Sequence, residues 1–257
     1  MAVDVDDHGA PSVLGQNTPL MDRITIAALQ AMKREGRKIV GVVAWDTPMA
    51  LVAERAGVDL VSVGDSVGVN LWGRSEEAPV SLAEMLLVCK AVRRGVKRAL
   101  LSCDVPWGSL DDAKRLVADG GADMVKVLAP AQRVEAMAKA GIAVFAEFHG
   151  KRPTAELVAE AKELEAAGAV MLDFRHSGPE AGAAVAQAVK IPVIGGLGGG
   201  PWLDGRIRMA HAAIGYGAQW LDSHAETYAH VASIALGALS AYAEDVRAGR
   251  QIKGQRG

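Results

Sequence analysis

Two aspartates follow apolar segments that the sequence marks as buried strands. Asp65 comes after LVSVG at 60–64, and Asp104 comes after ALLSC at 99–103. Two carboxylates in one poorly solvated site repel each other, and a cation between them removes that cost. Oxygen ligands without a nearby His or Cys cluster favour a hard ion, Mg²⁺ first and Mn²⁺ second. Such an ion can chelate an α-keto acid and stabilise the enolate formed beside its carbonyl. The alternative is that each aspartate caps a helix or joins an ion pair.

Further polar residues in apolar segments could take part in acid–base chemistry. Lys126 lies inside MVKVL, where an unpaired ammonium is costly unless it meets an anion. It could hold the substrate carboxylate or the enolate oxygen, form a Schiff base, or pair with a structural aspartate. Enolisation also needs a base, for which Glu147, Asp173 and His149 are candidates. We favour Glu147, because its place in a strand directs it inward.

Two arginines stand near these residues in the sequence, Arg152 and Arg175. A guanidinium offers a planar fork that suits carboxylate or phosphate oxygens. Either arginine could therefore bind a second anionic group of a substrate, or be an ordinary surface residue.

The elements that would position these residues repeat along the chain. Short apolar, β-branched segments alternate with Ala-rich stretches of helical period from residue 39 onward, which predicts repeated strand–helix units. The segments predicted as strands are 39–45, 60–64, 99–103, 124–128, 143–148, 169–174, 192–197 and 218–222. Eight such units favour a closed (β/α)₈ TIM barrel of the α/β class over an open sheet. In that fold the carboxyl ends of all strands meet at one mouth, where the polar residues would converge.

The length of 257 residues suits one domain of this kind. We predict a flexible N-terminal arm at 1–21 and a single barrel domain at 22–257. A helix at 22–35 would cover the lower end of the barrel. A long Ala-rich helix at about 225–247 could pack in part against another subunit.

Composition narrows the class of partner and the compartment. A formal net charge of −2 provides no basic face for nucleic acid or an anionic membrane, so a small molecule is the expected partner. Cys89 and Cys103 stand in apolar surroundings and do not make a disulfide framework, which indicates a reducing compartment. The N-terminal segment lacks the cationic start and apolar run of a signal peptide. We therefore expect a cytoplasmic protein.

Several segments together resemble one known family. They are TIAALQ at 25–30, AWDTPMA at 44–50, AGVDLVSVGDSVG at 56–68, APVSLAEM at 78–85, AVRRG at 91–95, LLSCDVPW at 100–107, GGADMVKV at 120–127 and IPVIGGLGGGPWLDG at 191–205. These segments resemble ketopantoate hydroxymethyltransferase, within the wider superfamily of phosphoenolpyruvate mutase and isocitrate lyase. The VGDS motif and its spacing from the aspartate of CDVP are the most specific part of the resemblance.

The resemblance implies a particular site and reaction. Asp65 and Asp104 would bind Mg²⁺, and Ser66 and Lys126 would contact the keto acid. The family transfers a hydroxymethyl group from 5,10-methylenetetrahydrofolate to the enolate of a branched keto acid. Its members are homo-oligomers, often decamers.

The sequence departs from the family at three places. The family has a glutamate two positions after the strand-four lysine, and here that position is Leu128. The family has a Gly-His stretch and a long insertion after strand five, whereas here AEFHGKRP leads directly into a helix, with Glu147 and His149 as the polar candidates. The family's catalytic glutamate at the end of strand six falls on Arg175, or on Asp173 if the alignment shifts by two.

These departures leave three functions open. The first is an aldol-type hydroxymethyltransferase acting on an α-keto acid. The second is a carbon–carbon lyase or mutase acting on a dicarboxylate or phosphonate, with arginine binding the extra anionic group. The third is a relative that has lost catalysis.

Overall fold

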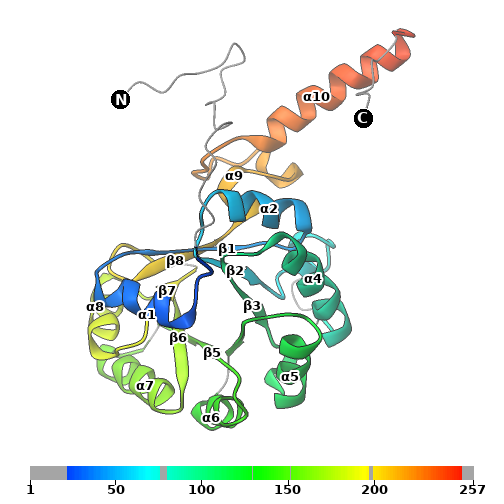
Figure 1. The fold of residues 1–257 in the computed structure, drawn as a ribbon. Helices are drawn as coiled ribbons and strands as arrows, with labels where there is room; N and C mark the ends of the chain where they lie inside the picture. Colours follow the sequence, from blue (N-terminus) through cyan, green and yellow to red (C-terminus); the bar gives the residue numbers. More distant parts are fainter. Residues whose placement is uncertain (1–21, 76–79, 129, 151, 197–198, 251–257) are drawn as a thin grey trace.

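A closed parallel barrel forms the body of the protein. The structure is a computed structural model, and it describes residues 22–75, 80–128, 130–150, 152–196 and 199–250. Each strand pairs with the next in sequence, and the eighth pairs with the first, as Figure 1 shows. The strands are β1 (Ile39–Val43), β2 (Leu60–Val63), β3 (Leu100–Asp104), β4 (Met124–Leu128), β5 (Val144–His149), β6 (Ala169–Arg175), β7 (Val193–Gly195) and β8 (Gly205–Met209). The predicted (β/α)₈ TIM barrel is confirmed.

Helices surround much of this barrel (Figure 1). They are α1 (Ile26–Arg34), α2 (Thr47–Arg55), α3 (Val67–Asn70), α4 (Leu82–Gly95), α5 (Leu110–Ala118), α6 (Ala131–Lys139), α7 (Thr154–Ala166), α8 (Pro179–Ala188), α9 (Ala210–Ile214) and α10 (Val231–Arg247), with 3₁₀ turns η1 (Pro106–Gly108) and η2 (Ala218–Trp220). Local sequence sets several helix starts. In α4, Ser81 and Glu84 form a capping box that satisfies two backbone N–H groups. Asp46 caps α2 by accepting from the backbone N–H of Met49 at 2.7 Å.

The lower part of the barrel interior is apolar. Each strand contributes one buried side chain to this layer, namely Ile39, Leu60, Leu100, Met124, Phe145, Met171, Ile194 and Ile207. Leu29 and Met32 of α1 pack against the same layer, so α1 closes this end of the barrel as predicted. The apolar layer gives the polar residues above it a floor from which water is excluded.

The upper part of the interior is polar because strand side chains alternate in direction. Residues two positions beyond the apolar layer face the interior again. They include Ser62 on β2, Ser102 on β3, Lys126 on β4, Glu147 on β5 and Asp173 on β6. Residues of the opposite parity, such as Phe148 and Phe174, belong to the outer core between strands and helices.

The predicted eighth strand at 218–222 is wrong. Residues Ala218–Trp220 form η2, and β8 lies at Gly205–Met209 instead. The apolar run AQWLD suggests a strand but lies beyond the barrel, whereas GRIRM alternates arginine with apolar residues and buries Ile207 inside. The register confirms this position, because Val40 pairs with Arg206 and Gly41 with Ile207.

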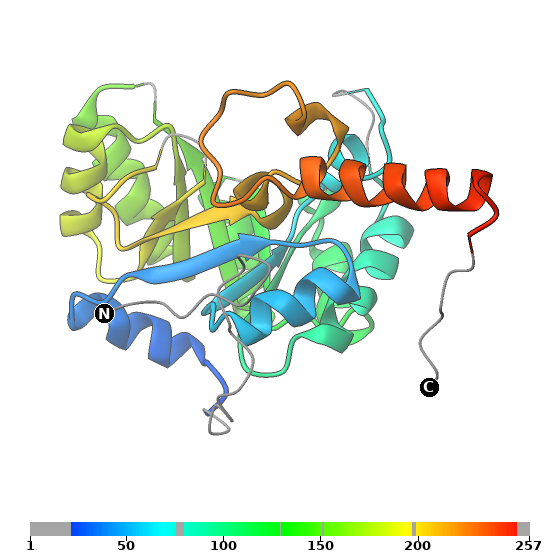
Figure 2. The same ribbon diagram turned by 90° about the horizontal axis from the view of Figure 1, so that it is seen from above.

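The last helix extends away from the barrel. Figure 2 shows α10 running past the edge of the barrel. Ala232 is the only buried residue of α10, and the exposed apolar residues of this helix are Ile234, Leu236, Leu239, Tyr242 and Val246. The helix starts at Val231, later than the predicted residue 225. The predicted arm at 1–21 lies outside the described residues. In the part of the chain that is described, no helix combines the length and apolarity needed to cross a bilayer.

Candidate active site

A cavity of about 900 Å³ opens at the carboxyl ends of the strands. Its lining includes the polar residues Ser62, Asp65, Ser66, Asn70, Asp104, Lys126, Glu147, Asp173 and Arg175. The structure therefore brings together most of the residues that the sequence nominated. In barrels of this type, reactions take place at this end.

Asp65 and Asp104 lie side by side at the ends of β2 and β3. The backbone N–H of Asp65 donates to Oδ2 of Asp104 at 3.3 Å. The other oxygen, Oδ1 of Asp104, is buried and accepts no hydrogen bond from the described residues. A Cβ at Gly64 would lie 2.9 Å from Oγ of Ser66, so a larger residue at position 64 would require the Ser66 side chain to move. The result is a carboxylate with one oxygen held and the other available.

Burial dominates the electrostatics of Asp104. It raises the pKa of Asp104 to about 7, opposed by the charge of Lys126 and assisted by the charge of Asp65. A raised pKa means that the ionised carboxylate lacks sufficient positive charge nearby. A cation at Oδ1 would supply that charge.

Lys126 lies at the centre of the acidic residues. Its Nζ is 2.5 Å from Oε2 of Glu147, 3.2 Å from Oδ2 of Asp173 and 3.8 Å from Oδ1 of Asp104. Burial would lower the pKa of Lys126, but these three carboxylates outweigh burial and raise it. Lys126 is therefore an ammonium ion, which disfavours the Schiff-base alternative because a Schiff base needs a neutral amine.

Glu147 joins Lys126 to Arg175. Its Oε2 contacts Lys126, and its Oε1 accepts from Nη1 of Arg175 at 2.8 Å. Burial tends to raise the pKa of Glu147, but the two cations outweigh it and hold the pKa below its ordinary value. This carboxylate is a weak base that holds two cations in place.

Asp173 differs from Glu147 although both face Lys126. Its Oδ1 accepts from the backbone N–H of Gly196 at 3.3 Å. Burial and the nearby charge of Glu147 raise the pKa of Asp173 in spite of Lys126. A buried carboxylate with a raised pKa is the better proton acceptor of the two.

The donor set suits a divalent hard cation. Asp65 and Asp104 would supply carboxylate oxygens, and Oδ1 of Asp104 is buried without a hydrogen bond from the described residues. Within the described ranges, no three His, Cys, Asp or Glu side chains gather as a metal site. Water and substrate would therefore complete the coordination, as is usual for Mg²⁺.

Other predicted residues lie at the edge of the site or outside it. Ser66 lines the cavity next to Asp65. His149 is exposed at the end of β5, pairs in register with Arg175, and does not contribute to the lining. Arg152 forms an ion pair with Glu160 on the surface and is not among the residues that line the cavity.

Sequence reasoning missed the pair of serines beneath the two aspartates. Ser62 and Ser102 are buried beneath the aspartates and share a hydrogen bond of 2.7 Å between their hydroxyls. Ser62 and Ser102 precede Gly64 and Asp104 by two residues. Because residues i and i+2 of a strand lie on the same face, this spacing could have indicated that the two serines face the barrel interior. Trp107 lines the cavity with a positive φ of 59°, a strained conformation of the kind found at binding sites.

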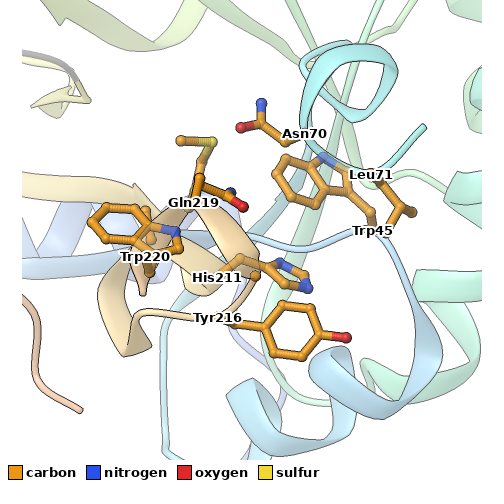
Figure 3. Close-up of a pocket in the computed structure, with 10 residues that line it drawn as sticks. Trp45, Asn70, Leu71, His211, Tyr216, Gln219 and Trp220 are labelled. Carbon is orange, nitrogen blue, oxygen red and sulfur yellow. The ribbon is translucent and has the colours of Figure 1, made fainter. Parts of the chain in front are cut away.

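A smaller pocket of about 60 Å³ adjoins the cavity and shares Trp220 and Asn70 with it. Figure 3 shows the ring of His211 lying against those of Trp45 and Tyr216. The His211 and Trp45 ring centroids are 5.0 Å apart, and Nδ1 of His211 is buried with no hydrogen-bond partner among the described residues. Burial lowers the pKa of His211 despite Asp46, so this histidine is a neutral packing residue.

The fold and cavity define a β/α-barrel with an acidic, lysine-centred site at its mouth. Comparison with known proteins then identifies the family. Residues 23–251 match the model of the ketopantoate hydroxymethyltransferase family, and the chain belongs to that family. A 3-methyl-2-oxobutanoate hydroxymethyltransferase of Geobacillus kaustophilus is 34% identical over 84% of this chain and 87% of its own length. The corresponding protein of Carboxydothermus hydrogenoformans is 32% identical over 88% of this chain and 92% of its own.

Solved structures share the fold at lower identity. A 2,3-dimethylmalate lyase of the PEP mutase/isocitrate lyase superfamily has a TM-score of 0.61 at 15% identity, covering 90% of both chains. A putative lyase/mutase from Burkholderia cenocepacia J2315 has a TM-score of 0.61 at 20% identity, covering 86% of this chain and 87% of its own. At these identities the likeness establishes the barrel fold alone.

Proposed function

We propose that the protein catalyses aldol-type carbon–carbon bond formation on an α-keto acid through an enolate, with Mg²⁺ or Mn²⁺ bound by Asp65 and Asp104. The observation that carries the proposal is the buried Oδ1 of Asp104, which accepts no hydrogen bond from the described residues and lies 3.8 Å from Nζ of Lys126. When bound, the metal supplies Lewis acidity that polarises the keto group. Family membership supports hydroxymethyl transfer from 5,10-methylenetetrahydrofolate as the reaction.

The chain's own residues divide the work by their charge states. Ser66 and the Lys126 ammonium would bind the keto-acid oxygens, because both line the cavity. Asp173 would accept the proton from the carbon next to the carbonyl, since its raised pKa makes it the better base. Glu147 would keep Lys126 in position instead of acting as the base that its sequence position first suggested.

The proposal is tested by proton exchange. Wild-type protein in D₂O with Mg²⁺ should exchange the protons beside the carbonyl of 2-oxobutanoate or 3-methyl-2-oxobutanoate, measured by ¹H NMR. EDTA and Asp104→Ala should abolish the exchange. Failure of the wild type to exchange either keto acid would favour a relative without catalysis. Consumption of methylenetetrahydrofolate in the same mixture would identify the one-carbon donor.

We also propose that the protein is a homo-oligomer in which α10 contributes to the contact. The apolar residues of α10 are exposed on a helix that leaves its own barrel, as Figure 2 shows. An exposed apolar helix face is typical of a subunit interface. The decameric state expected from the resemblance is part of this proposal.

A further inference from the structure

Two serine hydroxyls lie below the aspartate pair, at the closed end of the cavity. Ser62 on β2 and Ser102 on β3 pair in register, and the two residues are 1% and 0% exposed. Oγ of Ser102 donates to Oγ of Ser62 at 2.7 Å, and among the described residues this is the only hydrogen bond of either side chain. Each hydroxyl carries one proton, so a single shared bond leaves one proton without an acceptor.

The surroundings of the two serines show which proton is left over. Ser62 lines the cavity, whereas Ser102 does not. If Ser62 donated to Ser102, the Ser102 proton would be enclosed without an acceptor, at a cost of about 1–3 kcal/mol. When Ser102 donates to Ser62, the remaining proton belongs to Ser62 and faces the cavity, so this cost is avoided. Ser62 therefore presents an O–H donor to the cavity, and the bond from Ser102 strengthens that donor.

The position above Ser62 leaves its hydroxyl open to the rest of the cavity. Gly64 stands two residues further along the chain and has no side chain, and a Cβ there would lie 3.7 Å from Oδ2 of Asp104. Asp104 pairs in register with Lys126, and Gly64, Asp104 and Lys126 all line the cavity together with Ser62. A ligand held at Asp104 and Lys126 therefore has the Ser62 hydroxyl below it.

The depth of the Ser62 hydroxyl suits a short ligand. Ser102 and Asp104 are two residues apart on β3, which places their Cα atoms about 6.6 Å apart along the strand. One hydrogen bond spans about 2.8 Å of that distance. The remaining length of about 4 Å corresponds to about three covalent bonds, as between consecutive Cα atoms. A carbonyl carbon at the level of Asp104 can thus place an oxygen, about three bonds away, against Ser62.

The charges near the serine pair favour a neutral oxygen. Lys126 already faces three carboxylates, those of Asp104, Glu147 and Asp173. Below the serines lies the apolar layer of the barrel, which supplies no cation. A further carboxylate at Ser62 would therefore lose its hydration without gaining a positive partner, which is costly. A hydroxyl oxygen accepts from Ser62 without that cost.

We infer that Ser62 donates a hydrogen bond to a neutral oxygen of the substrate, so that the substrate is a short α-keto acid carrying a hydroxyl group. The inference rests on the proposed function, because it assumes that Asp65, Asp104 and Lys126 hold the keto-acid end. Ser62 then determines specificity, and Ser102 is a positioning residue for its hydroxyl. Ser62 discriminates against an analogue with a methyl group in place of the hydroxyl, because its donor is then left unpaired.

The test compares keto acids that differ only by a hydroxyl in place of a methyl group. The pairs are 4-hydroxy-2-oxobutanoate with 2-oxopentanoate, and the shorter 3-hydroxypyruvate with 2-oxobutanoate. Calorimetric titration with Mg²⁺ present gives Kd, and exchange of the protons beside the carbonyl in D₂O gives KM and kcat. The ¹H NMR spectra also resolve any pyruvate released by reverse aldol cleavage. We expect one hydroxy acid to have a Kd about three- to tenfold below that of its methyl counterpart, the size of one neutral hydrogen bond.

Variants then assign the preference to the serine pair. Ser62→Ala should raise the Kd of the preferred hydroxy acid about three- to tenfold and leave that of its methyl counterpart within about twofold. Ser102→Ala should remove part of the preference and leave kcat unchanged, because Ser62 keeps its donor but loses the bond that orients it. The double variant replaces both partners with apolar groups and should fold like the wild type. Ser240→Ala, at an exposed position of α10, is the matched control and should change neither Kd.

The two readouts distinguish failure of the inference from failure of the proposed function. Equal wild-type affinity for both members of each pair would overturn the inference and indicate that Ser62 donates to water only. An equal loss of both members in Ser62→Ala would overturn it as well. A preference that depends on Ser62, without proton exchange in any keto acid, would overturn the proposed function and leave the subsite in place.

Discussion

Leu128 on β4 pairs in register with Glu147 on β5. The family resemblance places a glutamate at position 128, two residues after the lysine, and the structure puts a carboxylate on the neighbouring strand directly beside that position. Side chains of paired residues on adjacent strands lie on the same face of a sheet. Glu147 can therefore contact Lys126, at 2.5 Å, from the adjacent strand. Lys126 thus has an acidic partner on the strand next to the position where the resemblance places a glutamate.

Replacement of Asp104 should cause the most complete loss of function. Asp104→Ala removes the buried oxygen that accepts no hydrogen bond from the described residues and should abolish Mg²⁺ binding measured by calorimetry, together with keto-acid exchange. The fold should persist, because the variant also removes a buried carboxylate whose burial is unfavourable. Asp46→Asn, at a helix cap outside the cavity, is the control and should leave Mg²⁺ affinity unchanged. Metal binding by Asp104→Ala at wild-type affinity would remove Asp104 from the site.

Asp173 and Glu147 should differ in kinetics. Asp173→Asn keeps the size of the side chain and removes the proton acceptor, so kcat for exchange should fall about 10²-fold or more while KM changes little. Glu147→Gln should mainly raise KM, because it loosens Lys126 and Arg175 without removing the base. The opposite pattern, with kcat lost in Glu147→Gln and retained in Asp173→Asn, would restore Glu147 as the base.

Glu147 should also make stability depend on pH. Its pKa in the folded protein lies below its ordinary value because Lys126 and Arg175 outweigh burial. Its ionised form therefore contributes stability that is fully present above the unfolded pKa, about 4.3, and is lost as pH falls through the folded pKa. At pH 7, Glu147→Gln should be less stable than the wild type by about 1–3 kcal/mol.

Urea unfolding at several pH values checks this expectation. The difference in free energy of unfolding between the two proteins should shrink below about pH 4, where Glu147 becomes protonated in the unfolded chain. A difference that grew on acidification would mean that the cations do not hold Glu147 ionised.

Much of the fold could be predicted from the sequence because apolar segments and the glycines between them mark strands and turns independently of their neighbours. Gly57, Gly121 and Gly168 have the positive φ expected where helices end. The eighth strand could not be found this way. Its pattern of Arg206, Ile207 and Arg208 resembles a surface segment, and closure against β1 gives it a strand conformation.

The site was partly predictable for a related physical reason. The position of a residue along a strand indicates that it faces the barrel mouth, which placed Asp104, Lys126, Glu147 and Asp173 together. It does not indicate how charges pair across strands, and that pairing sets the pKa values. The choice of Asp173 over Glu147 as the base depends on the hydrogen bond that the Arg175 side chain donates to Glu147, and no feature of the sequence reveals this contact.

The exposed face of α10 provides a test of assembly. Leu239 and Tyr242 are 66% and 56% exposed and lie three residues apart, on one side of the helix. Leu239→Glu combined with Tyr242→Glu should convert the oligomer to particles of smaller mass in light scattering, because charge in an apolar interface is unfavourable. Ser240→Glu, on the same helix, should keep the wild-type mass. A wild-type protein that sedimented as a 26.8 kDa monomer would exclude the interface.

A final test swaps the residues at positions 128 and 147, because Leu128 and Glu147 pair in register. Glu147→Leu alone leaves Lys126 without its nearest carboxylate and should reduce keto-acid exchange about 10²-fold, equivalent to about 3 kcal/mol for a buried pair. Leu128→Glu combined with Glu147→Leu returns a carboxylate to the same face of the sheet, two residues from Lys126 on its own strand. Activity on a monoacid should then recover by about tenfold or more, and a double-mutant cycle should show coupling of at least about 1 kcal/mol. Arg175 lacks its carboxylate partner in both variants. Activity on monoacids that recovers in the double variant would therefore locate the effect at Lys126. Additive losses would show that the two positions do not share one role.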